Sequence, residues 1–232
     1  MDRDQRACSD CVLRGGCGLL DLAGEQGAQE TIEVDEFRAD APIALRPGRL
    51  FAVRSGAVKS LCADGVGGVG IIDLRFPGDL IGLESVAEPG SDAVEFRAAI
   101  PMTTVCHIRF DADAARRSSR RFCERLSAEL AARIRSTYRY RQMIRSGARL
   151  RVAHYLTKAM RAAPLSGGRG PQRLPAVSRT DIAGYLHMRA ETVSRVLSDF
   201  RRSGWIGGPV DRIEVVDRAA IEALVHAGLP NA

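Results

Sequence analysis

SRTDIAGYLHMRAETVSRVLSDFRRSG, residues 178–204, is the segment that decides the fold, and its spacing predicts two short helices joined by a turn at residues 187–189. Ser178 followed by Asp181 is a capping-box-like start for the first helix. The second helix alternates inward apolar residues with outward polar ones; the inward set is Val193, Val196, Leu197 and Phe200, and the outward set is Glu191, Ser194, Arg195 and Arg201. Polar hydrogen-bonding groups near the start of such a helix are typical of DNA-recognition helices.

The residues that follow this pair predict a small hairpin. Residues 204–206 and 212–216 are strand-like, and Gly207-Gly208-Pro209 lies between them. A helix-turn-helix followed by a hairpin is a winged helix. An amphipathic helix pair with a solvated polar face is the alternative, but it does not account for the hairpin.

Composition narrows the class of protein. The chain has 232 residues, 45% hydrophobic and 27% charged, which is ordinary for a globular protein of two modest domains. No apolar run approaches the ~20 residues of a membrane span, and the start, MDRDQRACSDC, lacks the apolar core of a signal peptide. We therefore expect a cytoplasmic protein with no membrane partner.

The net charge of +6 is unevenly distributed. Residues 112–151 contain twelve Arg and three acidic residues, a local charge of +9, which leaves −3 for the rest of the chain. A basic segment beside a winged helix favours a phosphate-rich partner.

Three cysteines near the start form a C-x2-C-x5-C pattern: Cys8, Cys11 and Cys17. Thiolates this closely spaced in a loop can surround one metal centre. Zinc sites usually have two C-x2-C pairs, and only one occurs here, whereas iron–sulfur clusters often take a fourth ligand distant in sequence. Three incidental thiols in a tail are the remaining alternative.

The middle of the chain changes from strand to helix periodicity. From about residue 31 to residue 110, short alternating runs are broken by Gly and Pro, which predicts a β-roll or barrel. From residue 112 to about residue 146, a helical seam follows, made of Leu126, Leu130, Ile134, Thr137, Arg141 and Ile144. Gly147 ends that pattern, and further helices are predicted at residues 149–160 and 218–225.

A β-roll, a long helix and a C-terminal winged helix, in that order, resemble the CRP/FNR family of bacterial transcription regulators over essentially the whole chain. The matching stretches are FAVRSGAVK at 51–59, PGDLIG at 77–82 and ETVSR at 191–195. The resemblance implies an α+β fold: a cysteine-rich loop (1–25), a jelly roll like those that bind cyclic nucleotides (26–110), a dimerisation helix (111–147) and a winged helix-turn-helix (148–232). It also implies a homodimer whose partners are double-stranded DNA and RNA polymerase.

Within that family the chain resembles the FNR branch, which regulates anaerobic and microaerobic metabolism in response to oxygen. The resemblance implies a [4Fe–4S] cluster on Cys8, Cys11, Cys17 and Cys106. Cys62 and Cys123 have no counterpart in that pattern, and we interpret them as buried small hydrophobic residues. If the ligand set differs, Cys62 is the expected substitute.

The family's Glu-x-x-Ser-Arg pattern reads a TTGAT-like half-site, and this role falls on Glu191, Ser194 and Arg195. Glu191 can accept from a cytosine amino group, Arg195 can donate two hydrogen bonds to guanine, and Ser194 can bond to either kind of group. The predicted phosphate contacts are Ser178, Arg179, Thr180 and Arg189. Two positions depart from the family: His187 stands where the turn usually has Gly, and Arg189 stands where a capping Thr or Ser is common.

Cyclic-nucleotide members of the family hold the phosphate with an Arg-Ser pair. The corresponding stretch here, residues 91–95, is SDAVE, and two carboxylates oppose a phosphate. We expect no cyclic nucleotide.

Our hypothesis is that an intact cluster braces the base of the long helix and favours the dimer, and that oxygen releases DNA. Two alternatives remain open: a family regulator that senses nitric oxide, haem or redox state without a cluster, and a constitutive DNA-binding protein with a structural zinc. An enzyme is not expected, because no nucleophile–base pairing is evident and the four His residues lie in separate elements.

Overall fold

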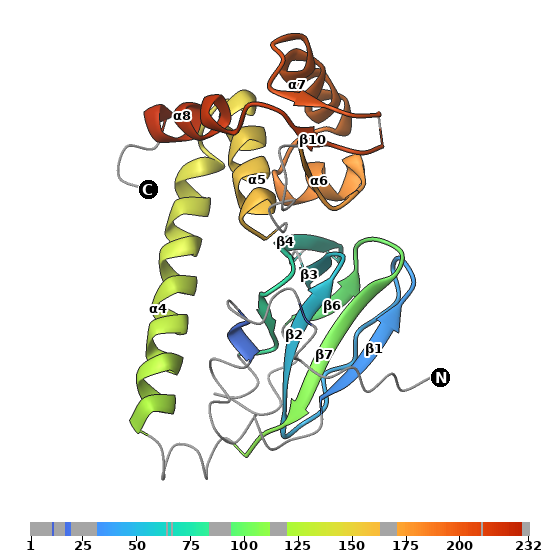
Figure 1. Cartoon of the computed structure of the whole chain (residues 1–232), viewed down its shortest axis with the longest axis vertical. Helices are drawn as coiled ribbons and strands as arrows, with labels where there is room; N and C mark the ends of the chain where they lie inside the picture. Colours follow the sequence, from blue (N-terminus) through green and yellow to red (C-terminus); the bar gives the residue numbers. More distant parts are fainter. Residues whose placement is uncertain are drawn as a thin grey trace. The chain divides into compact units, whose positions relative to one another are not determined.

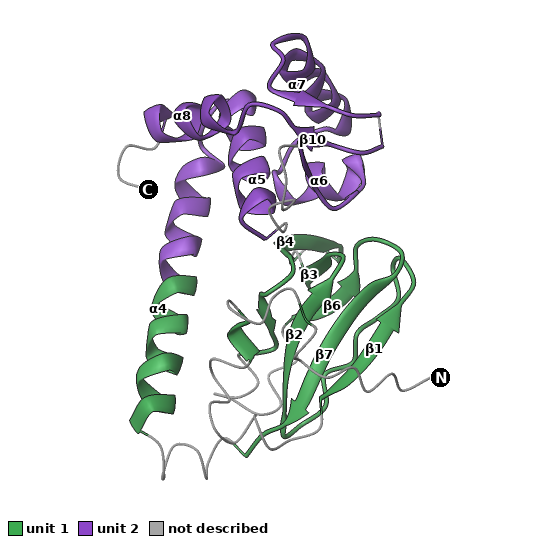
Figure 2. Cartoon of the chain, viewed as in Figure 1, with its two compact units in different colours: residues 1–133 green, residues 134–232 purple. Residues whose placement is uncertain are grey.

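The computed structural model describes Cys11 and residues 17–19, 32–63, 65, 67–83, 94–111, 120–162, 171–209 and 211–228. The chain divides into two compact units, residues 1–133 and 134–232 (Figure 2). Within the described ranges, no helix combines the length and the apolar character needed to span a membrane.

The first unit is built mainly of strands (Figure 1). These are β1 (Glu33–Phe37), β2 (Arg49–Ser55), β3 (Val58–Ala63), β4 (Val69–Arg75), β5 (Leu80–Ile81), β6 (Glu95–Ala98) and β7 (Thr103–Arg109). The helix α4 (Arg120–Met143) begins in this unit and ends in the second.

Two antiparallel sheets form the β-roll, one in the order β1-β7-β2-β5 and the other in the order β4-β3-β6. The turn from β2 to β3 depends on Gly56, which has φ +84° and whose added Cβ would come within 2.8 Å of the Thr103 backbone. The interior between the sheets is an apolar cluster of Ile43, Phe51, Val53, Val58, Ile81, Phe96 and Val105.

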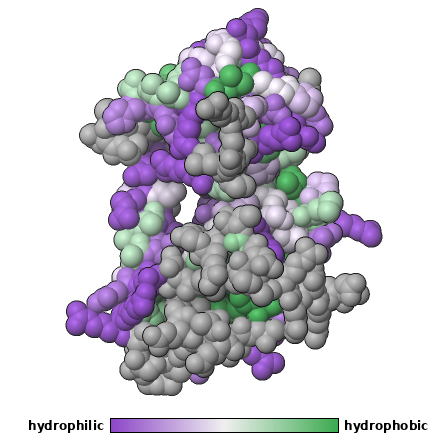
Figure 3. Space-filling view, in the orientation of Figure 1, coloured by the Kyte–Doolittle hydropathy of each residue, from purple (hydrophilic) through white to green (hydrophobic). Residues whose placement is uncertain are grey.

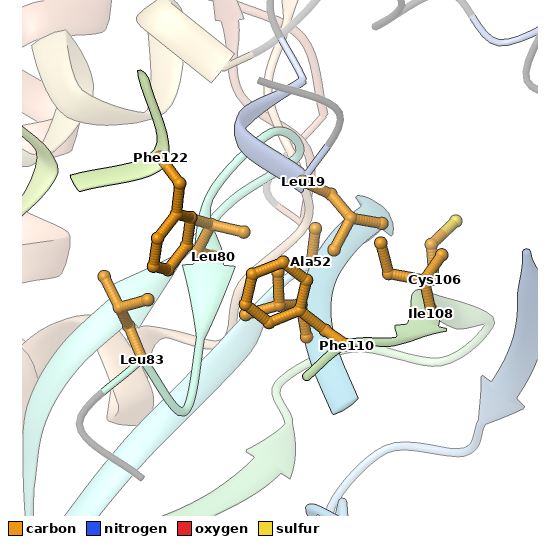
Figure 4. Packing of buried hydrophobic residues seen from close by; sticks show 9 residues of the cluster. Leu19, Ala52, Leu80, Leu83, Cys106, Ile108, Phe110 and Phe122 are labelled. Atoms are coloured by element: carbon orange, nitrogen blue, oxygen red, sulfur yellow. The ribbon is translucent and has the colours of Figure 1, made fainter. Parts of the chain in front are cut away.

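The opposite face of the four-stranded sheet carries a second cluster, which we call the outer cluster. Its members are Leu19, Leu50, Ala52, Leu80, Leu83, Cys106, Ile108, Phe110 and Phe122. Since successive side chains of a strand point to opposite faces, Cys106 and Ile108 lie here while Val105 points inward. Figure 4 shows Leu19 entering this cluster on the side of Cys106 and Phe122 entering it on the side of Leu80.

The second unit contains the winged helix. Its elements are α5 (Ala148–Ala162), β8 (Gln172–Arg173), α6 (Arg179–Tyr185), α7 (Ala190–Arg202), β9 (Ile206–Gly207), β10 (Glu214–Val215) and α8 (Arg218–Gly228). The strands form a sheet in the order β8-β10-β9. The core buries the expected apolar stripe of α7 against α6 and α5, and α8 packs on α5.

The structure confirms the α+β class, the β-roll, the long helix and the winged helix. Two details of the sequence interpretation are wrong. The wing has a third strand, β8, because Gln172 and Arg173 pair with Val215 and Glu214. Arg201 is half-buried rather than free in solvent, since its guanidinium donates to the Pro209 carbonyl at 3.1 Å.

Candidate nucleic-acid interface and cysteine site

The recognition helix α7 separates its two faces cleanly. Its four apolar residues, Val193, Val196, Leu197 and Phe200, are buried. Glu191, Ser194 and Arg195 are exposed, and their i, i+3 and i+4 spacing puts them on one face near the start of the helix. This face offers an acceptor, a hydroxyl and a guanidinium, which are the groups that distinguish base edges in a major groove.

The two helices of the pair begin differently. The Ser178 hydroxyl oxygen accepts from the Asp181 backbone N–H at 3.0 Å, so α6 has a side-chain cap. Arg189 occupies the N-cap of α7 and makes no side-chain cap hydrogen bond. The predicted absence of a cap on α7 is therefore confirmed, and the exposed Arg189 guanidinium is available to a ligand.

The predicted phosphate contacts at the start of α6 differ in exposure. Thr180 is exposed, whereas Arg179 is half-buried. Burial lowers the pKa of Arg179 below its ordinary value, and the positive charge of Arg201 acts in the same direction. The group stays charged, because an Arg pKa starts far above neutrality.

Sequence reasoning missed Arg149, which contacts the aromatic rings at the end of α7 and the start of the wing. Its guanidinium lies 4.9 Å from the ring centroids of both Phe200 and Trp205. Those two rings stack with their centroids 5.0 Å apart, and the backbone N–H of Trp205 donates to the Phe200 carbonyl at 2.9 Å. The end of α7 and the start of the wing are thus fixed to each other and to α5.

The structure brings together only some of the cysteines predicted to bind an iron–sulfur cluster. Cys8 lies outside the described residues, and Cys11 and Cys17 are partly exposed. Cys106 is buried in the outer cluster, and Cys17 packs against that same cluster. Among the residues that the structure describes, no three His, Cys, Asp or Glu side chains form a group that could hold a metal.

The interpretation of the two additional cysteines needs correction. Both Cys62 and Cys123 are partly exposed rather than buried. Cys123, on α4, packs against the outer cluster together with Cys17. Cys62 lies on β3 in the other sheet. Of these two cysteines, Cys123 is therefore the one that packs against the cluster containing Cys106.

A buried polar network lies next to Cys106, and the sequence interpretation missed it. The His107 Nε2–H donates to Asp35 at 3.0 Å, and Nδ1 accepts from the Arg49 guanidinium at 2.7 Å. Arg49 also donates to Glu33 at 2.8 Å. Burial keeps the pKa of His107 below its ordinary value, and Asp35 opposes that shift. These bonds connect β1, β7 and β2, and therefore fix the strand that carries Cys106.

The helix α4 exposes apolar side chains along one stripe. Leu130, Ile134 and Tyr138 recur every four residues, and Ile134 and Tyr138 are 53% and 62% exposed. Figure 3 shows apolar patches among the hydrophilic side chains along this helix. Leu126, which belongs to the same predicted seam, packs instead against the outer cluster.

Comparison with known proteins indicates the kind of protein that carries this fold. Residues 150–224 match the Crp-like helix-turn-helix domain. Over 97% of this chain, the sequence is 27% identical to the transcriptional activator protein Anr of Pseudomonas aeruginosa, covering 95% of that protein. It is equally similar to the activator FnrA of Stutzerimonas stutzeri, at 27% identity over the same shares of both chains. These matches support a regulator of the CRP/FNR family, in its FNR-like branch.

A solved structure of the CRP/FNR family agrees with the fold. FixK2 of Bradyrhizobium japonicum superimposes with a TM-score of 0.69 and 27% identity, over 84% of this chain and 97% of that one. The chain is accordingly a DNA-binding transcription regulator of the CRP/FNR type, and its relatives are named as regulators rather than enzymes.

Proposed function

We propose that this regulator senses oxygen through a [4Fe–4S] cluster held by Cys8, Cys11, Cys17 and Cys106, and that the cluster controls dimerisation and binding to TTGAT-type palindromes. Glu191, Ser194 and Arg195 read the bases, while Ser178, Arg179, Thr180 and Arg189 contact phosphates. RNA polymerase is the further partner, at genes of anaerobic or microaerobic metabolism.

The observation that carries the proposal is the composition of the outer cluster. It contains Cys106 from β7, Leu19, which is two residues after Cys17, and Phe122 from α4. The segment at residues 17–19 therefore packs in the same apolar group as the start of the long helix. Tethering that segment would stabilise the group, and with it the position of α4.

The donor set suits an iron–sulfur cluster. All four proposed ligands are thiols, which favour iron–sulfur clusters over hard cations, and Cys106 lies among apolar side chains that limit the access of water. A [4Fe–4S] cluster supplies iron–thiolate bonds that oxygen disrupts. The chain's own residues supply the rest: Leu19 and Phe122 pack in the outer cluster, and the Arg133 guanidinium donates to the Leu80 carbonyl at 2.9 Å, which fixes α4 to β5.

The exposed stripe of α4 is the proposed dimer seam. Leu130, Ile134 and Tyr138 provide apolar contact with a second copy. The same stretch of helix carries Arg135, Arg139 and Arg141 without an acidic residue between residues 130 and 143. Two such positively charged helices repel each other, so the free energies of monomer and dimer are nearly equal in this proposal. A few kcal/mol from a bound cluster then shifts the equilibrium towards the dimer.

The first experiment measures iron and acid-labile sulfide in protein purified without oxygen, and the visible spectrum before and after exposure to air. We expect comparable iron and sulfide and a brown colour that bleaches in air. Cys106→Ser should lose both elements, while the matched control Cys62→Ser should keep them.

Sedimentation and binding to a duplex carrying a TTGAT palindrome follow in both states. We expect the dimer and the tight complex only before exposure to air. Zinc without sulfide would replace the proposal with a structural metal site. Colourless protein that binds the palindrome equally well in air would leave the regulator with another signal, and equal dimerisation with and without iron would rule out the proposed switch.

A further inference from the structure

The turn between α6 and α7 is held by side chains from outside the helix pair. The Tyr140 hydroxyl, near the end of α4, donates to the Tyr185 carbonyl at 2.7 Å. The Tyr140 ring stacks on the Tyr185 ring at 5.2 Å and lies 6.2 Å from the His187 ring. All these residues belong to the second unit.

Arg151, on α5, completes the arrangement. One guanidinium nitrogen donates to the Leu186 and His187 carbonyls at 3.2 and 3.3 Å, and Nε donates to the Ser146 carbonyl at 2.9 Å. The last carbonyls of a helix have no partner within the helix, and a cation there is favourable. Three successive carbonyls, of residues 185–187, thus accept hydrogen bonds from Tyr140 and Arg151.

The local sequence does little to fix this turn by itself. His187 has φ +50°, a left-handed conformation that favours glycine. The following helix starts at Arg189 without a side-chain cap. The direction in which α7 leaves the turn therefore depends on donors that come from α4 and α5.

We propose that Tyr140 and Arg151 are positioning residues for DNA recognition: by holding the α6–α7 turn, they aim the face of Glu191, Ser194 and Arg195. This inference rests on the proposed DNA-reading role of that face. It also implies that the end of the long helix acts directly on the geometry of recognition.

The test compares Tyr140→Phe with the control Ser136→Ala, which removes an exposed hydroxyl from the same helix outside the proposed dimer seam. The probes are a duplex with the TTGAT palindrome and a scrambled duplex of the same composition, at one fixed salt concentration. We expect Tyr140→Phe to lower affinity for the palindrome about ten-fold, the effect of one lost hydrogen bond, and to leave affinity for the scrambled duplex unchanged. Ser136→Ala should match the wild type on both duplexes.

A second variant separates positioning from general stability. Glycine relieves the left-handed turn, so His187→Gly should restore most of the discrimination lost in Tyr140→Phe. Arg151→Lys, which keeps the charge but loses the planar fork, should lower discrimination, whereas Arg161→Lys on the exposed side of the same helix should not.

The outcomes distinguish the two proposals. If the wild type prefers the palindrome and Tyr140→Phe discriminates equally well, the positioning role is wrong and the DNA-reading role stands. If the wild type shows no preference for the palindrome, the DNA-reading role fails and the positioning role fails with it. A loss of affinity matched by an equal loss of dimer in sedimentation would assign the effect to dimerisation and overturn the inference.

Discussion

The exposed face of α7 is formed by neighbouring residues of one helix, whereas the outer cluster around Cys106 is formed by residues from several elements. Glu191, Ser194 and Arg195 lie within about one turn of a single helix, so helical periodicity alone puts them together. The outer cluster draws on the segment at residues 17–19, on β2, β5 and β7, and on α4. Its geometry therefore depends on strand register and on contacts between residues far apart in the chain.

This difference separates two kinds of substitution. A change on the exposed face of α7 removes a proposed contact with DNA and should leave the fold intact, because those side chains are exposed. A change in the outer cluster alters stability and the proposed ligand site together, because the same residues serve both. Four predictions follow from this contrast.

Leu19→Ala should have the largest effect on stability. Leu19 is 1% exposed within the outer cluster, and truncating a buried Leu costs about 3 kcal/mol. Calorimetry should show a lower melting transition for the first unit, and protein purified without oxygen should retain less iron. Val69→Ala, at an exposed position of β4, is the control. An unchanged transition would show that the Leu19 segment does not contribute to the folded unit.

Arg195→Ala should lower discrimination between the palindrome and a single-base variant by about 1–3 kcal/mol, the typical value of a bidentate guanine contact. The melting temperature should not change, since the side chain is exposed. Fluorescence anisotropy with both duplexes measures the ratio. Arg202→Ala, an exposed Arg on the same helix that pairs with Asp199, should weaken binding to both duplexes equally. If the Arg195 variant also weakened both equally, Arg195 would be a phosphate contact.

Substitutions at the N-caps of α6 and α7 test how side-chain capping contributes to the stability of the second unit. Ser178→Ala removes the cap of α6 and should cost about 1 kcal/mol in the free energy of unfolding. Arg189→Ser adds a cap that α7 lacks and should gain about 0.5 kcal/mol. Urea denaturation of both variants measures the difference. Equal effects of the same sign would contradict the observed caps.

The smallest effect concerns a long-range pair in the first unit, in which the nearly buried Lys59 ammonium donates to Asp40. This hydrogen bond and the positive charge hold the pKa of Asp40 below its ordinary value. The folded chain therefore binds this proton less readily than the unfolded chain. The contribution of the Lys59–Asp40 pair to the free energy of unfolding is complete above the ordinary Asp pKa. It is lost as the pH falls through the lowered pKa of Asp40 in the folded chain.

Asp40→Asn should thus destabilise the first unit by about 0.5 kcal/mol near neutral pH, a small value because Asp40 is 71% exposed and screened by solvent. Urea denaturation at several pH values should show the variant and the wild type converge in acid. Asn tolerates the left-handed backbone of residue 40, so the change isolates the charge. Glu36→Gln, at an exposed position of β1, is the control. A difference that stays constant down to acid pH would argue against the ion pair.

Much of the fold was predictable because its signals are local. Alternating runs between turn residues predicted the β-roll of residues 31–110 as a whole. The strand β8 was missed, because a two-residue strand carries no periodic signal. The same reasoning explains Arg201, whose partner is a carbonyl of the wing eight residues away.

The candidate sites also differ in whether their signals in the sequence are local or long-range. The exposed face of α7 and the cap at Ser178 could be predicted from residue type and spacing, whereas the missing cap at Arg189 and the unusual turn at His187 were expected from the resemblance to the family. The network around His107, the position of Arg149 beneath two aromatic rings and the bonds from Tyr140 and Arg151 to the turn could not, because each joins elements that only the folded chain brings together.

The sequence by itself determined the order of the elements, the winged helix and the exposure of Glu191, Ser194 and Arg195 on α7, because helical and strand periodicities act over a few residues. Only the tertiary structure decided that Cys106 shares the outer cluster with Leu19 and Phe122, and that Cys123 rather than Cys62 lies against that cluster. It also decided that side chains of α4 and α5 hold the α6–α7 turn. Those facts depend on which face of a strand meets which helix, and strand register and packing between distant segments fix that choice.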